Sequence, residues 1–281
     1  MMDTDALRVL LAGLAFAGPH LLLGFPPLRP RLAAALGEQR FVALFALVAA
    51  AGLALLAVAL AASDGGGAGP GARLPATVRG VLLAPGIAGL ILAFAALRAY
   101  PRHPAALFRA GLMPPRGIEK VSRHGFFVGF GTFAGVHALL AHEAAPAIAF
   151  GVLATVCAIG ALAQDRKLHA RYGEGWHDYA RQTSVLPGLA LMQGRTRLLP
   201  GDRIGAAVIR AVVAVVVFAA LHPLWALGHG AAFIAVLAAG GVVVSVRRLW
   251  IARRTDSASH RRSQDPASQD RPPPAATARD T

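Results

Sequence analysis

Two histidines, His20 and His137, each lie inside a long apolar stretch of the sequence. A titratable imidazole is costly in hydrocarbon, so it is seldom placed there without a partner. Neutral imidazoles on two different helices are typical of the axial ligands that hold a heme iron. Two unrelated polar packing contacts would give the same pattern, so the elements that carry the two residues have to decide between these interpretations.

The apolar stretches have the composition and length of membrane spans. Of the 281 residues, 56% are hydrophobic and only 15% are charged, whereas soluble domains average about 25% charged residues. The mean hydropathy is +0.54, and the apolar residues form blocks of about 20, the length that crosses a bilayer. These features predict an all-α fold, a polytopic transmembrane bundle of six to seven helices in one domain over residues 1–250. Residues 251–281 are polar and basic and are predicted to form a disordered cytoplasmic tail.

Seven spans follow from the hydropathy, and the fourth of them is short. They cover residues 6–28, 41–62, 78–97, 125–141, 144–163, 206–227 and 231–249. The sixth and seventh are also compatible with one span and a re-entrant segment. His20 and His137 lie on antiparallel spans in this scheme, at depths that differ by about 8 Å at 1.5 Å per residue. That difference is compatible with a shared porphyrin.

The distribution of basic residues predicts the orientation of the chain. The net charge is +14, and the arginines and lysines gather after spans one, three, five and seven. The loops after spans two, four and six hold only Arg73 and Arg79. The positive-inside rule then places the N-terminus outside and the C-terminus in the cytoplasm. Because the charge lies in loops and not on a basic face with interleaved aromatics, it indicates a lipid bilayer as partner and argues against nucleic acid.

The polar segment between spans five and six has an amphipathic pattern. Leu168, Tyr172, Trp176 and Tyr179 recur every three or four residues, with an interruption at Gly173. Such a stripe is typical of a helix that lies on a membrane surface. We expect this segment to cover the cytoplasmic side of the bundle.

Small residues beside His137 leave two interpretations open. Gly131, Ala134, Gly135 and Ala138 share one helical face of the fourth span. A face of this kind lets either a flat ring or another helix approach closely.

The remaining histidines are weaker candidates. His142 and His222 lie near the outer ends of spans four and six, where they would meet in a second metal or polar site or act as interfacial hydrogen-bonding groups. His169 and His177 lie in the cytoplasmic polar segment and are expected to be solvated.

Several short motifs, in order and at similar spacing, resemble the NnrU family of membrane proteins from about Leu7 to Trp225. They are His20 with Leu28-Arg29-Pro30 and Gly37-Glu38; Ser122-Arg123-His124 with Gly129 and His137; Asp165-Arg166-Lys167, Arg171-Tyr172-Gly173-Glu174, Thr183-Ser184-Val185, Pro187 and Gly194-Arg195; and His222-Pro223. The chain is also similar to the 15-cis-zeta-carotene isomerase of plants and cyanobacteria, which contains the same domain.

The resemblance implies a cofactor and a setting. The isomerase carries heme b between two axial histidines, which correspond to His20 and His137. Bacterial members are associated with nitrite and nitric oxide reduction, which implies the inner membrane and a respiratory or denitrification enzyme as partner. The isomerase has a cysteine where this chain has Ala134, and the family has a proline where this chain has Gly125. Heme binding is therefore the expectation, with cis–trans isomerisation of a lipophilic carotenoid as the alternative.

Two other readings remain open, and with them the question of whether the protein is an enzyme. Arg123 and His124 at the head of a span, with Tyr179 later, also resemble membrane methyltransferases that bind S-adenosylmethionine. Asp165 stands where those enzymes have paired glutamates. An assembly factor for a denitrification enzyme would need no catalytic residue. Catalytic residues thus remain unknown, and Arg123, His124, Asp165 and Arg166 are secondary candidates beside His142 and His222.

Overall fold

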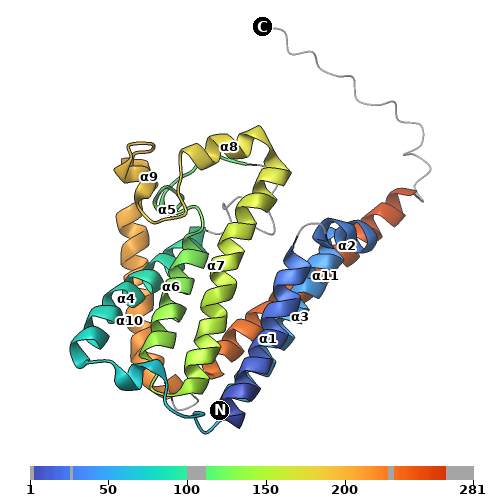
Figure 1. Cartoon of the computed structure of the whole chain (residues 1–281). Coiled ribbons are helices and arrows are strands. Elements are labelled where there is room, and N and C mark those ends of the chain that lie inside the picture. The colour runs from blue at the N-terminus through green and yellow to red at the C-terminus, as the bar shows by residue number, and fades with distance from the viewer. Residues whose placement is uncertain (1–2, 26–27, 100–111, 227–230, 264–281) are drawn as a thin grey trace.

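The computed structural model describes residues 3–25, 28–99, 112–226 and 231–263 (Figure 1). Helices make up most of these ranges, and they hold no strand beyond an isolated bridge between Ala68 and Glu143. The expected all-α class is confirmed.

Within the described ranges, seven long helices form the bundle: α1 Thr4–Gly24, α3 Glu38–Ala61, α4 Ala76–Ala99, α6 Gly125–Leu140, α7 Ala144–Tyr172, α10 Ile204–Ala226 and α11 Ala231–Ser263. The shorter elements are α2 Leu28–Leu36, η1 Pro70–Arg73, α5 Ile118–Val121, α8 Glu174–Arg181, α9 Leu189–Met192 and η3 Pro200–Asp202. Six of the long helices have the length and hydropathy to cross a membrane, and α6 is a shorter apolar helix. Large apolar side chains such as Val81 and Val243 are exposed on the outer faces, as expected for surfaces that face lipid.

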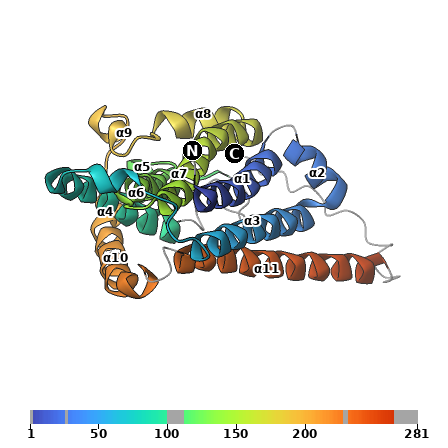
Figure 2. The same ribbon diagram turned by 60° about the horizontal axis from the view of Figure 1, so that its bottom comes forward.

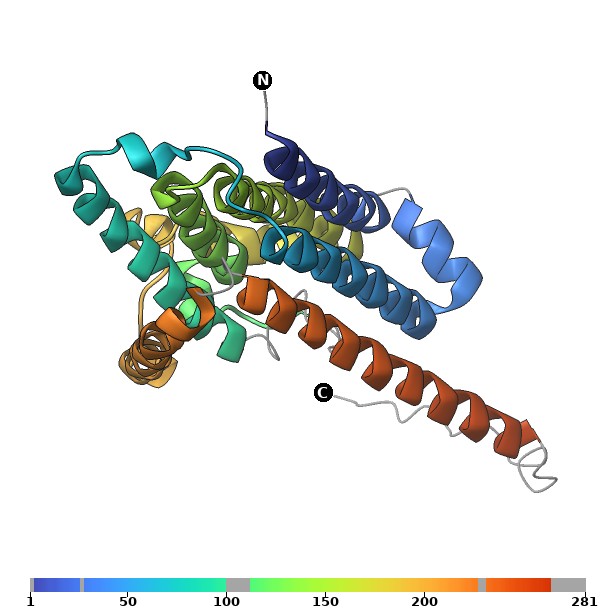
Figure 3. The ribbon, with the colours of Figure 1, turned by 90° about the horizontal axis from the view of Figure 1, so that it is seen from below.

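The helices pack around α6 and α7. Helix α6 lies between α4 and α7, while α1 contacts both α7 and α3. Helix α11 runs along α3 and α10 lies beside α4 (Figures 2 and 3). The main core joins Phe16 of α1, Leu56 of α3, Phe130 and Phe133 of α6 and Phe150 of α7.

The two ends of the bundle differ in charge. We call the end that carries α2, α5, α8 and α9 the α8 end, and the opposite end, with η1 and the start of α1, the η1 end (Figure 1). Basic residues such as Lys120, Arg171 and Arg195 lie at the α8 end, whereas Arg73 and Arg79 lie at the η1 end. The loops rich in basic residues thus gather at the α8 end, and the loops with few basic residues lie at the η1 end.

Several boundaries differ from the predicted spans. Helix α1 ends at Gly24, not at residue 28; Pro26 and Pro27 lie outside the described residues. Helix α7 continues beyond residue 163 into the amphipathic segment and ends at Tyr172. Gly173, with a φ of +54°, separates it from α8, which carries the rest of that segment. Spans six and seven are two separate helices. Helix α11 continues to Ser263, so the predicted disordered tail begins as a helix, and residues 264–281 lie outside the described part.

Glycines set the closest helix contacts. A Cβ on Gly129 of α6 would lie 2.5 Å from the carbonyl oxygen of Gly89 of α4, so the two backbones touch. On the other side of α6, a Cβ on Gly131 would lie 3.0 Å from Cβ of Cys157. The small-residue face beside His137 therefore packs against neighbouring helices, as small residues commonly do in membranes.

Candidate functional site

His137 lies in the last turn of α6, at the η1 end of the bundle. Its ring centroid is 4.1 Å from that of Phe133 and 5.1 Å from that of Phe150 on α7. Its Nδ1 is 3.2 Å from the backbone oxygen of Phe133. A proton on Nδ1 satisfies this carbonyl and leaves the lone pair on Nε2, the form in which a histidine binds a metal.

His222 of α10 is the second imidazole at this place. The ring centroids of His137 and His222 are 6.2 Å apart, with 63° between the ring planes. The Phe218 ring lies 6.0 Å from that of His222 and 5.9 Å from that of Phe133. The two imidazoles thus share an apolar, aromatic surrounding.

His142 is engaged elsewhere. Its Nε2 accepts a hydrogen bond from Nη1 of Arg79 on α4, at 2.9 Å. Of the two alternatives for His142 and His222, the described contacts do not include their meeting, because the imidazole beside His222 is that of His137.

His20 has a different set of neighbours. Its ring lies 5.2 Å from that of Phe16 and 4.8 Å from that of Phe45 on α3. Its Nδ1 is buried and has no hydrogen-bond partner among the described residues. None of these contacts is shared with His137.

The register of the helices on α7 shows how far apart the two predicted ligands lie in depth. His137 packs against Phe150, and a Cβ on Gly13 of α1 would touch Val152 at 2.9 Å. Helices α1 and α7 run in the same direction, so His20 lies about nine residues, or about 13 Å, nearer the α8 end than His137. A shared iron would need the two Nε2 atoms about 4 Å apart, twice a metal–imidazole bond. The His20–His137 pairing stays a prediction, and it requires α1 to move along α7.

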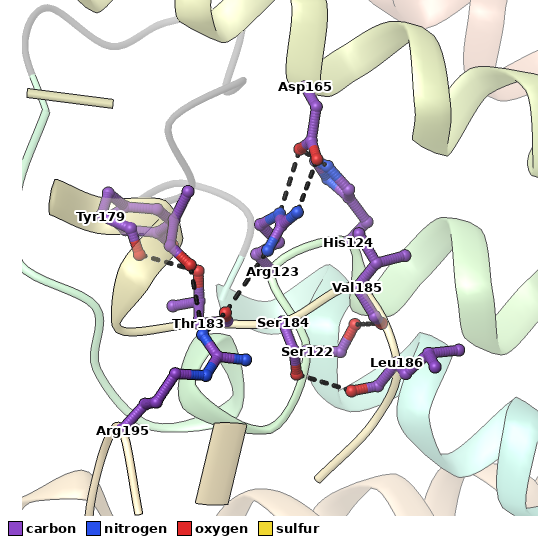
Figure 4. A network of polar contacts seen from close by, with 11 residues as sticks. Ser122, Arg123, His124, Asp165, Tyr179, Thr183, Ser184, Val185, Leu186 and Arg195 are labelled. Atoms are coloured by element: carbon purple, nitrogen blue, oxygen red, sulfur yellow. Dashed lines mark hydrogen bonds and ion pairs between the residues drawn. The ribbon is translucent and has the colours of Figure 1, made fainter. Parts of the chain in front are cut away.

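Three of the secondary candidates, Arg123, His124 and Asp165, form a polar network at the α8 end (Figure 4). Arg123 donates from Nε and Nη2 to the two carboxylate oxygens of Asp165, at 3.0 and 2.6 Å. Nε2 of His124 lies 2.5 Å from Oδ1 of the same carboxylate. His124 is only 1% exposed, so its ring is held inside the protein.

The same network holds the chain that follows α8. The backbone N–H of Arg123 donates to the carbonyl of Ser184 at 2.9 Å, and the Ser122 hydroxyl donates to the carbonyl of Val185 at 2.7 Å. Nη1 of Arg195 donates to the carbonyl of Thr183 at 2.7 Å. Residues 183–186 are thereby tied to the start of α6.

These contacts occupy the residues that the methyltransferase interpretation assigns to its cofactor. Its predicted cofactor contacts, Arg123 and His124, are bonded to Asp165, and Tyr179 is buried and stacked on Trp176 with centroids 5.2 Å apart. They hold the α8 end together, while Arg166 is exposed.

One buried ion pair carries no sequence motif. Nζ of Lys120 on α5 lies 2.8 Å from Oδ2 of Asp202 in η3, and both side chains are largely buried. Lys120 and Asp202 are far apart in the chain and neither lies in a recognisable sequence motif, so the sequence would not have predicted that they pair.

The described residues contain no group of three or more histidine, cysteine or acidic side chains that converge as a metal site.

The helices, their apolar outer faces and the polar cap at one end define a polytopic α-helical membrane protein. The family model described as NnrU protein matches residues 9–231, so the chain belongs to the NnrU family. No curated protein and no solved structure matches the chain.

Proposed function

We propose that this NnrU-family protein binds one heme b in the membrane, with His137 as an axial ligand, and that it serves nitrite or nitric oxide reduction or a related redox step. The observation that carries the proposal is the hydrogen bond that orients the His137 ring. Its Nδ1 is bonded to the Phe133 carbonyl, which orients the ring and presents Nε2 as the ligand atom.

His222 fits the second axial position. Two imidazoles bound to one iron through bonds of about 2 Å have ring centres about 6 Å apart, and the centroids of His137 and His222 are 6.2 Å apart. The Phe133, Phe150 and Phe218 rings supply apolar walls beside the two imidazoles. Little of α10 is buried inside the bundle, so in this proposal α10 would move aside to admit the ring from the lipid side.

The resemblance to the isomerase assigns the second position to His20 instead. The buried, unpartnered Nδ1 of His20 supports an unmet bonding need at that residue. The two assignments predict different sets of variants that lose the cofactor, so they can be separated.

When bound, the heme would supply electron transfer. The protein residues would hold the ring and shield it, since low solvent access raises the reduction potential and slows side reactions. In this proposal the α8 end faces the cytoplasm of a bacterial cell, in line with its basic residues.

The test is an absorption spectrum of the full-length protein in detergent, purified from cells with ample heme. Ligation by two histidines predicts a sharp Soret band and a reduced α band. Both are expected to disappear in His137→Ala and His222→Ala and to remain in His20→Ala and in the control His142→Ala. Loss in His20→Ala and His137→Ala, with retention in His222→Ala, would assign the ligands as the resemblance does. A colourless wild-type protein would overturn the heme proposal.

The respiratory role has a separate test. A strain that lacks the gene is expected to accumulate nitrite or nitric oxide during nitrite respiration. The wild-type gene should correct this defect, and the His137→Ala gene should not. Equal correction by both would contradict a role for the heme in that process.

A further inference from the structure

Two histidines that were expected to be solvated meet at the turn between α7 and α8. Nε2 of His169 and Nε2 of His177 are 2.9 Å apart, and their ring centroids are 4.6 Å apart. Both residues are exposed. The ring nitrogens that converge here come from two helices that Gly173 separates.

The local fold sets this meeting. Leu168 and Trp176, which precede the two histidines in the chain, are buried together with Tyr179 in a small apolar cluster. That packing fixes the rotation of α7 and α8 about their axes, and therefore the direction of the next side chain on each helix. The pair is held by the fold before any ligand arrives, which lowers the entropic cost of binding.

The distance matches the needs of a metal ion. Imidazole nitrogen is a preferred ligand of Zn²⁺ and Cu²⁺. With bonds of about 2 Å, two nitrogens on one tetrahedral or square-planar ion lie about 3 Å apart. In the metal-free pair, the N–H of one ring can lie between the two nitrogens. Metal binding would require both rings in the tautomer that carries its proton on Nδ1, so that both Nε2 lone pairs are free.

We propose that His169 and His177 bind a divalent transition metal ion, Zn²⁺ or Cu²⁺, at the α8 end, with water completing the coordination. Glu174 on α8 adds negative charge to the same helix, on which Asp178 is paired with Arg181. The ion would fix the angle between α7 and α8, and thereby the start of the chain that runs into residues 183–186. The site lies at the opposite end of the bundle from His137, so it does not depend on the proposed heme.

The test uses the full-length protein in detergent, stripped of metal and carrying an affinity tag without histidine. Calorimetric titration with Zn²⁺ is expected to reveal one saturable site, and Cu²⁺ is expected to give an electron paramagnetic resonance signal with nitrogen coupling. His169→Gln and His177→Gln should each weaken binding more than about tenfold, which corresponds to about 1.4 kcal/mol. His142→Gln is the matched control: it also removes an exposed imidazole, but one that is bonded to the Arg79 cation. It should bind as the wild type does.

A second measurement needs no substitution. Carbethoxylation of histidines, mapped by mass spectrometry, should be slowed by Zn²⁺ at His169 and His177 but not at His142. Absence of a saturable site, or Zn²⁺ protection that does not include both His169 and His177, would overturn the proposal. Gel filtration and circular dichroism of the variants show whether a loss of binding reflects a loss of fold.

Discussion

Arg123 and Asp165 form a two-point hydrogen bond that joins the start of α6 to the extension of α7. The geometry matches the planar guanidinium to the two carboxylate oxygens, which is the strongest arrangement of such a pair. His124 shares the same carboxylate. The carboxylate of Asp165 on α7 thus binds both Arg123 and His124 at the start of α6 (Figure 4).

Asp165→Asn should lower the stability of the protein. The substitution keeps the shape but removes the charge opposite Arg123, whose side chain is only 15% exposed. We expect a loss of about 1–3 kcal/mol, less than for a fully buried pair because the Asp165 side chain is 29% exposed. Thermal unfolding can be followed with a thiol-reactive dye, since Cys157, the single cysteine of the chain, is buried. The control Asp178→Asn breaks an exposed pair with Arg181 and should change the midpoint little; equal shifts in both variants would contradict the role of Asp165.

Gly241→Ala should loosen α11 from α3. A Cβ at Gly241 would lie 2.9 Å from Cβ of Ala50 and 3.0 Å from the carbonyl oxygen of Ala46, so the helices must separate. Overpacking of this kind costs about 1–3 kcal/mol. The neighbouring Gly240 has nothing within 4 Å of such a Cβ. Gly240→Ala should therefore be neutral or stabilise the helix by up to about 1 kcal/mol. The same dye assay compares the two, and a greater loss for Gly240→Ala would contradict the packing of α11.

Asp202→Asn should release the segment before α6. The Asp202 carboxylate accepts hydrogen bonds from the backbone N–H of Gly117 at 2.8 Å and of Leu199 at 2.7 Å, besides its ion pair with Lys120. Loss of its charge leaves the largely buried Lys120 ammonium without its counter-ion. Hydrogen exchange should become faster in residues 112–121 and 197–203 and stay unchanged in the middle of α7. The exposed Glu174→Gln serves as control; exchange that is unaltered in both segments of Asp202→Asn would refute this prediction.

The orientation can be tested with new cysteines. Asp64 lies at the η1 end and Asp178 at the α8 end, both exposed. The positive-inside rule places the η1 end outside. A membrane-impermeant maleimide should label Asp64→Cys in intact cells, and Asp178→Cys only after the cells are opened. The wild type, with Cys157 buried, gives the background, and the reverse labelling pattern would invert the proposed topology.

Hydropathy was sufficient to predict the spans because each span has to satisfy the bilayer by itself. The short fourth span follows from composition and length. For the sixth and seventh spans the sequence left a re-entrant segment open, and the structure has two separate helices there. The ends were less predictable. Helix α7 extends past its apolar part to Tyr172 because Leu168 in this extension packs against Trp176 and Tyr179. A hydropathy window does not detect that packing.

The contacts that the candidate side chains make could mostly not be predicted from the sequence. The sequence drew attention to Arg123, His124 and Asp165 through their motifs, yet their mutual bonds depend on α6 and α7 meeting at that level. The Lys120–Asp202 pair had no signal at all.

The sequence by itself determined that the protein is a helical membrane protein, how its spans succeed one another and which loops are basic. These are properties of local segments and of their transfer into hydrocarbon. Only the tertiary structure decided that His137 meets His222, that His20 lies among other rings and that His169 meets His177. The reason is that the rotation and depth of each helix are set by contacts with distant segments, such as the touching backbones of Gly89 and Gly129.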